Sequence, residues 1–158
     1  MIEKYFLHRI QRENGSFVKG IEIHDNLDSA VLSYWGRVKL AYGASQAIDA
    51  MFVKITDKTG NVVDNYEFAW KADGVDLNGA YFMHHIMLTG ETFGKDIDVC
   101  NSLGSAIVSF ASTMEYGYGN PKHSTVSYVS CEITDCGGAV MDPYKKYWEE
   151  PEPEPNNE

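Results

Sequence analysis

The sequence lacks a long apolar run, a CxxC pair and an excess of positive charge, and each absence narrows what the chain can be. No run of roughly 18 apolar residues occurs, so the sequence predicts no membrane-spanning helix. The first residues show no basic stretch followed by an apolar one, so we expect a protein that is not secreted. Its three cysteines are odd in number, which favours free thiols in a reducing compartment over a disulfide framework.

Negative charge dominates the chain. It has 13 Lys and Arg against 23 Asp and Glu, a formal net charge of -10. An acidic surface repels phosphate backbones, so we expect no nucleic-acid partner, whereas a protein partner is compatible with this charge. Glutamate alternates with proline in residues 149–158, and we expect these residues to form a disordered acidic tail.

An internal repeat is the strongest pattern in the sequence. The stretch Tyr5-Phe6-Leu7-His8-Arg9-Ile10 returns 76 residues later as Tyr81-Phe82-Met83-His84-His85-Ile86. After two extra residues near Pro121 the spacing becomes 78, and Ile55-Thr56-Asp57 matches Ile133-Thr134-Asp135. Roughly a third of the paired positions are identical and in the same order, so we interpret the chain as a tandem duplication of one module.

The sequence pattern of each copy predicts two β-hairpins with a helix between them. In the first copy the predicted strands cover residues 5–11, 17–24, 50–56 and 62–70. The turn Asn14-Gly15 is typical of a tight hairpin. Apolar residues at spacings of three and four predict a helix from Leu27, with Asp25 or Asn26 as its N-cap and Gly43 just after its end.

The fold class that follows is α+β, a tandem duplication of a ββαββ module. Each antiparallel sheet is covered by one helix, because nothing else is available to bury the apolar stripe of that helix. The expected organisation is a first module over 1–70, a linker over 71–80, a second module over 81–148 and the tail over 149–158. The linker is short, so we expect the modules to share a core or a sheet about a pseudo-twofold axis, in a monomer or a homo-oligomer.

Two histidines occupy matching positions in the copies. His8 and His84 lie 76 residues apart on the first predicted strand of each module and alternate with apolar residues. Symmetric histidines are able to form a ligand or metal pair across the pseudo-twofold axis. We favour the structural interpretation, in which each fills a semi-buried strand site and bonds to a neighbouring carbonyl, and we predict no metal.

No catalytic motif stands out in the sequence. Serine, histidine and aspartate occur, but not in a G-x-S-x-G setting. Gly137 and Gly138 lie in a predicted hairpin turn, where glycine supplies positive φ, so they do not indicate a phosphate-binding loop. Asp57 and Asp135 recur in both copies, and capping of a turn explains them better than paired acid-base catalysis. We therefore expect a protein that is not an enzyme and uses no cofactor.

One aromatic residue departs from the repeat. Trp35 lies on the first predicted helix, one step off the apolar stripe and near Arg37 and Lys39, whereas the second copy has Ala111 at that position. Tryptophan and arginine are enriched at binding hot spots. Trp35, Arg37 and Lys39 are therefore candidate contact residues, with simple edge packing as the alternative.

Four stretches of the chain carry a resemblance: residues 5–11, residues 19–23, the helix start Asp28-Ser29-Ala30 and the hairpin that contains Ile55-Thr56-Asp57. Through them the sequence resembles small uncharacterised proteins encoded by bacteriophages and prophages of gut bacteria. The resemblance covers each module in turn and implies no functional residues. It implies a context, the cytoplasm of a bacterial host or the virion.

Two functions of different classes follow as hypotheses. The preferred one is a protein-interaction module, associated with the virion or inhibiting a host factor. The alternative is a sponge that sequesters a nucleotide signal in a pocket at the pseudo-twofold axis, as an anti-defence protein. An anionic ligand needs clustered cations. In the first copy these are Arg9, Arg12, Arg37 and Lys39.

Overall fold

The structure is a computed structural model, and it describes residues 3–41, 47–77, 79–115 and 125–151. The elements of the first half are β1 (Tyr5–Glu13), β2 (Ser16–His24), α1 (Leu27–Lys39), β3 (Ile48–Thr56) and β4 (Val62–Lys71). Those of the second half are β5 (Tyr81–Thr89), β6 (Thr92–Cys100), α2 (Leu103–Met114), β7 (Val126–Thr134) and β8 (Val140–Glu149). Within these ranges, neither helix is long and apolar enough to cross a membrane.

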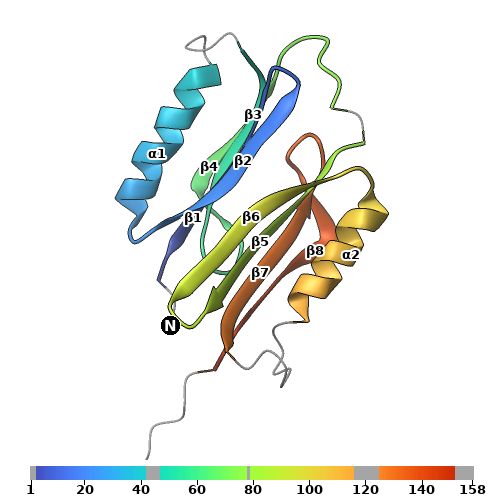
Figure 1. The fold of residues 1–158 in the computed structure, drawn as a ribbon. Helices are drawn as coiled ribbons and strands as arrows, with labels where there is room; N and C mark the ends of the chain where they lie inside the picture. Colours follow the sequence, from blue (N-terminus) through green and yellow to red (C-terminus); the bar gives the residue numbers. More distant parts are fainter. Residues whose placement is uncertain (1–2, 42–46, 78, 116–124, 152–158) are drawn as a thin grey trace, which may run out of the picture.

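Each half forms one four-stranded antiparallel sheet with one helix on its outer face (Figure 1). The strand orders are β2-β1-β3-β4 and β6-β5-β7-β8, so the two halves have the same topology. The predicted α+β class and the duplicated ββαββ module are confirmed. The matching order follows from the repeat, because the same alternation of apolar residues makes the same two strands central in each sheet.

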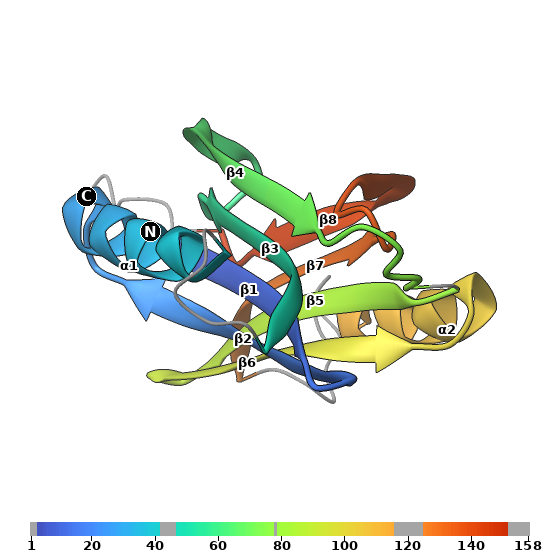
Figure 2. The same cartoon turned by 90° about the horizontal axis from the view of Figure 1, so that it is seen from above.

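The inner faces of the two sheets pack on each other, and the helices lie on the outside (Figure 2). The shared core between the sheets contains buried residues of both halves: Phe6, Ile10, Ile21, Ala50, Phe52, Leu77, Phe82, Ile86, Ile97 and Tyr128. Equivalent contacts repeat about a pseudo-twofold axis. The rings of Phe6 and Phe93 have centroids 6.2 Å apart, and the matching rings of Phe82 and Phe17 have centroids 5.3 Å apart. The expected shared core is therefore present, and the sheets remain separate.

The central strand β3 is buried on both faces. Met51, Val53 and Ile55 face α1, while Ala50 and Phe52 face the other sheet. Successive side chains of a strand point to opposite faces, so a strand between two apolar layers needs apolar residues at nearly every position.

Of the two residues predicted to cap the first helix, Asp25 and Asn26, the structure selects the second. Asn26 is the N-cap, and its side chain accepts a hydrogen bond of 2.9 Å from the backbone N–H of Ser29. The equivalent cap of α2 is Ser102, which accepts from the N–H of Ser105 at 3.1 Å. The described helix ends at Lys39, and Gly43 lies outside the described residues.

The turn between the third and fourth strands is capped by aspartate in both halves, as predicted. Asp57 Oδ1 accepts from the backbone N–H of Thr59 at 2.8 Å, and Asp135 Oδ1 accepts from that of Gly137 at 2.8 Å. Gly138 has φ +87°, in the left-handed region that glycine adopts without strain. These aspartates are structural turn residues.

The tail and linker boundaries differ slightly from the sequence prediction. The sequence predicts Glu149 as the first residue of the tail, but it is the last residue of β8, and Lys58 Nζ donates to its carboxylate at 3.0 Å. Residues 152–158 lie outside the described residues. In the linker, Leu77 is buried in the shared core, so this segment is anchored between the sheets. The linker therefore packs as part of the fold.

Candidate functional site

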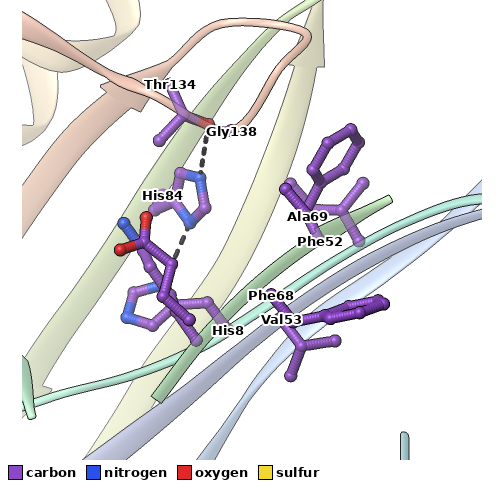
Figure 3. Close-up of a pocket in the computed structure, with 11 residues that line it drawn as sticks. His8, Phe52, Val53, Phe68, Ala69, His84, Thr134 and Gly138 are labelled. Atoms are coloured by element: carbon purple, nitrogen blue, oxygen red, sulfur yellow. Dashed lines mark hydrogen bonds between the residues drawn. The ribbon is translucent and has the colours of Figure 1, made fainter. Parts of the chain in front are cut away.

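His8 and His84 meet at the centre of the interface between the two sheets. Their Nδ1 atoms are 3.0 Å apart, and the two rings point toward each other (Figure 3). His8 comes from β1 and His84 from β5, the equivalent strand of the other half. Both are buried, with 5% and 3% of their surfaces exposed. The alternation of β1 and β5 points both residues inward, and the pseudo-twofold axis places them against each other.

A threonine holds the far side of each ring. His8 Nε2 is 2.8 Å from Thr56 Oγ1, and His84 Nε2 is 2.9 Å from Thr134 Oγ1. Thr56 and Thr134 end the equivalent strands β3 and β7. Each imidazole therefore has a defined orientation, with Nε2 on a hydroxyl and Nδ1 directed at the opposite histidine.

A buried ion pair lies beside the histidines. Lys54 Nζ is 2.5 Å from Glu132 Oε1, and the two residues are 6% and 4% exposed. The same carboxylate oxygen is 4.0 Å from His8 Nδ1 and 3.8 Å from His84 Nδ1. Four polar side chains from four central strands thus form one cluster inside an apolar core.

Lys54 and Glu132 occupy equivalent positions with opposite charges. They lie 78 residues apart, the spacing that relates Thr56 to Thr134. Lys54 is also opposite Glu67 in the pairing of β3 with β4, and Glu132 is opposite Lys145 in the pairing of β7 with β8. The two copies therefore carry opposite charges at this position, and the two modules contribute different side chains to the interface between them.

Burial lowers the pKa of both histidines and so favours their neutral forms. The pKa of His8 is well below its usual value because of burial and the nearby Lys54 ammonium. The pKa of His84 is well below its usual value because of burial, His8 and Lys54. Protonation of either ring would add a positive charge next to an ammonium in a medium that solvates it poorly.

A small cavity adjoins the cluster. Its volume is about 30 Å³, enough for a water molecule. The cavity is lined by both histidines and Lys54, and by Glu67, Phe68 and Ala69 of β4. In Figure 3 the two histidines lie on one side of it, and Phe68 and Ala69 lie on the other. Glu67 and Ala69 are exposed residues of the edge strand β4, so the cavity reaches toward solvent at this edge.

No family model, curated protein or solved structure matches the chain. The cluster is therefore interpreted from its own geometry and chemistry.

The structure brings the two predicted histidines together but changes their environment. We expected each to be semi-buried and bonded to a neighbouring carbonyl. Both are instead almost completely buried, and their partners are a threonine hydroxyl and the other histidine. The reason is that two sheets cover this position, so each ring is enclosed from both sides.

The predicted cationic residues lie elsewhere. Arg9 is on the face of β1 that α1 covers, opposite to the face that carries His8. Its pKa is lowered by burial and by the nearby Arg37 guanidinium, while Glu22 opposes this effect. Arg37 Nη2 is 3.5 Å from Glu22 Oε2. These cations therefore form a separate group between helix and sheet, away from the pseudo-twofold axis.

Trp35 and Lys39 are exposed on α1. Trp35 packs against Tyr34 edge to face, with ring centroids 5.1 Å apart. Neither residue is part of the histidine cluster. The structure thus separates the predicted binding residues into three places: the sheet interface, the layer beneath α1 and the outer face of α1.

Sequence reasoning missed Lys54 and Glu132. The repeat offered a signal, because aligning the copies puts opposite charges next to identical threonines on strands that are otherwise apolar. A charged residue inside an apolar strand needs a partner, and opposite charges at equivalent positions become partners when the copies face each other.

The lowered pKa values of the two histidines predict how the stability of the protein depends on pH. Their folded pKa values lie below the unfolded value of about 6.5, so the unfolded chain binds protons first as pH falls. In protein treated with EDTA, we expect the contribution of these histidines to the unfolding free energy to be constant above about pH 7.5 and to fall by about 2 kcal/mol between pH 7 and pH 5.5. Urea denaturation at each pH measures this.

The matched control for the pH experiment is His85→Gln, because His85 lies next to His84 on β5, is partly exposed and pairs with Asp98. This variant should keep the acid destabilisation, whereas His8→Gln combined with His84→Gln should remove most of it. If the double variant still loses the same unfolding free energy between pH 7 and pH 5.5, the acid destabilisation comes from other titratable groups.

Proposed function

We propose that the chain is a non-enzymatic protein-interaction module that binds its partner through the outer face of α1. The observation that carries this proposal is the exposure of two large apolar side chains on one helix. Leu32 is 78% and Trp35 is 55% exposed, and their spacing of three residues places them side by side. Exposed tryptophan next to an aliphatic residue is typical of a contact surface.

The geometry of Trp35 supports this role. Its ring rests against Tyr34, which is buried, so its orientation is restricted before any partner binds. A side chain that is already ordered loses less entropy on binding. Lys39 follows Trp35 by one helical turn and is exposed, so a partner with an apolar pocket and an acidic rim fits this surface.

The second helix provides a contrast within the same molecule. Val108, the equivalent of Leu32, is 67% exposed, and Ala111 replaces Trp35. Helix α2 contains no charged residue from Leu103 to Met114. The large aromatic anchor and the adjacent cation are therefore features of the first module alone, which favours recognition by that module.

The alternative function, sequestration of a nucleotide signal at the pseudo-twofold axis, receives less support. The cavity there is about 30 Å³, whereas small-molecule sites usually have roughly 300 Å³ or more. The four cations that such a ligand would need are not gathered at the axis. Arg9 and Arg37 lie on the other face of the first sheet, Arg12 pairs with Asp49, and Lys39 is exposed on α1. We propose that the chain acts as a protein-binding accessory protein in a phage-infected bacterial cell or in the virion.

The test is Trp35→Ala in the full-length chain. We expect partner capture from a lysate of phage-infected bacteria to fall about tenfold or more, because the variant removes a hot-spot side chain. The free energy of unfolding should change by less than about 1 kcal/mol, since the ring is more than half exposed. Quantitative mass spectrometry of the captured proteins and urea denaturation provide the two measurements.

Val108→Ala is the control, because it shortens an exposed apolar side chain at the position equivalent to Leu32 on the other helix. It should leave capture unchanged. The same proteins captured at the same yield by wild type and Trp35→Ala would argue against the proposal. A phosphorylated small molecule released at near-stoichiometric yield from the denatured protein would instead support sequestration.

A further inference from the structure

We propose that His8, His84 and Glu132 form a binding site for one divalent transition-metal ion of the zinc class, between the two modules. The ligand atoms of these three residues all lie within 4.8 Å of one another. Two imidazole nitrogens and a carboxylate oxygen are donors that zinc accepts, usually with a fourth position left for water. The three residues come from the central strands β1, β5 and β7, which hold them firmly.

The distances are close to those of a tetrahedral site. With metal-ligand bonds of about 2.1 Å, the ligand atoms of such a site stand about 3.4 Å apart. The two Nδ1 atoms are 3.0 Å apart, and Glu132 Oε1 is 3.8 Å and 4.0 Å from them. Each of the three separations therefore differs from the ideal value by about 0.6 Å or less.

The threonines supply the outer shell that a histidine ligand needs. A metal-bound imidazole donates its other N–H to an oxygen, which fixes the tautomer and the ring orientation. Thr56 Oγ1 and Thr134 Oγ1 lie 2.8 Å and 2.9 Å from the two Nε2 atoms. With both Nε2 atoms protonated and donating to these hydroxyls, both Nδ1 lone pairs face the same point, and a cation there removes their repulsion.

Glu132 provides an independent indication. Its Oε2 is buried and has no hydrogen-bond partner among the residues that the structure describes. A buried carboxylate oxygen without a partner is costly, and the cost is removed when it accepts a hydrogen bond or binds a cation. The carboxylate is already directed at the histidine pair.

Lys54 currently supplies the positive charge at this point, so the metal ion binds by exchange with its ammonium group. Lys54 Nζ contacts Glu132 Oε1 at 2.5 Å. Opposite Lys54 on β4 is Glu67, whose side chain emerges on the same face of the sheet. When the metal ion binds Glu132, the Lys54 ammonium pairs with Glu67 instead, so that the metal ion and the ammonium each contact one carboxylate.

The cavity gives the ion a route and a place for its fourth ligand. It has room for a water molecule beside the histidines, and exposed residues of β4 also line it. Bound there, the metal ion would link the two modules through ligands from both, and should stabilise the folded chain in proportion to the logarithm of its concentration.

The experiment is a zinc titration of full-length protein stripped with EDTA, in competition with a chromophoric chelator. We expect one Zn²⁺ per chain with a dissociation constant in the micromolar range or tighter, and a rise of several degrees in melting temperature. Co²⁺ in place of Zn²⁺ should give the visible absorption of a tetrahedral site. His8→Gln combined with His84→Gln should abolish all three signals.

Two further variants make the result specific. Lys54→Met removes the competing ammonium and should bind zinc at least tenfold more tightly, with a larger zinc-dependent rise in melting temperature. His85→Gln is the matched control, because it removes an imidazole from the same strand outside the cluster, and it should bind like wild type. The proposal is overturned if wild type binds no stoichiometric zinc, or if binding survives the loss of both His8 and His84.

Discussion

Lys54→Glu should destabilise the protein by about 3–5 kcal/mol, because it places two carboxylates against each other in the buried interface between the modules. Glu132→Lys should have a similar effect, with two ammonium groups in place of two carboxylates. The wild-type pair is 2.5 Å apart and almost completely buried, so solvent cannot screen the repulsion in either variant. Urea denaturation measures the loss.

The charge-exchanged protein, Lys54→Glu with Glu132→Lys, should recover most of the stability. The two positions are equivalent in the repeat, so each side chain enters a site that held its counterpart. The control is Lys19→Glu, which disrupts a pair with Asp96 that also joins the modules but is partly exposed. That variant should cost less than about 1 kcal/mol. A double variant no more stable than the single ones would contradict this account.

Separating the modules should abolish folding of each one. A fragment of residues 1–73 exposes the inner face of its sheet, including the fully buried Phe6 and the nearly buried Ile10 and Phe52. Such an apolar face leads to aggregation. A homodimer of this fragment about the same axis would put Lys54 opposite a second Lys54. We therefore expect no stable homodimer, and light scattering with circular dichroism tests this.

Co-expression of residues 1–73 with residues 74–151 should restore a folded 1:1 complex, because Lys54 then meets Glu132 again. Introducing Lys54→Glu into the first fragment should prevent assembly, and Glu132→Lys in the second should rescue it. This pair of results distinguishes a specific heterotypic interface from general apolar association. A well-folded monomer of the first fragment would show that the shared core is not required.

Much of the fold was predictable because it depends on local pattern. The alternation in residues 5–11 and 17–24, the cap at Asn26 and the turn aspartates act within a few residues of chain, where one sequence contains all the information needed. The repeat strengthened each prediction, because two diverged copies carry the same pattern. The error at Glu149 arose where the composition of a tail overlaps the end of a strand.

The histidine cluster was only partly predictable. The repeat identifies His8 and His84 as equivalent, and it puts opposite charges at Lys54 and Glu132. The repeat does not show that these residues are in contact. His8 and His84 are separated by 76 positions in the chain and meet only because the two sheets pack on each other. His8 and Thr56 are separated by 48 positions and meet only because β1 pairs with β3. The environment of the histidines was therefore predicted incorrectly.

The sequence by itself determined the duplicated ββαββ module, the turn aspartates, and an unmatched tryptophan on the first helix. Only the tertiary structure decided that the sheets stack face to face, that two neutral histidines meet on the axis, and that Lys54 pairs with Glu132. The physical reason is the separation along the chain between the residues that interact. Strand alternation and capping are set by neighbours in the chain, whereas the partner of a buried polar group is set by whichever surface covers it.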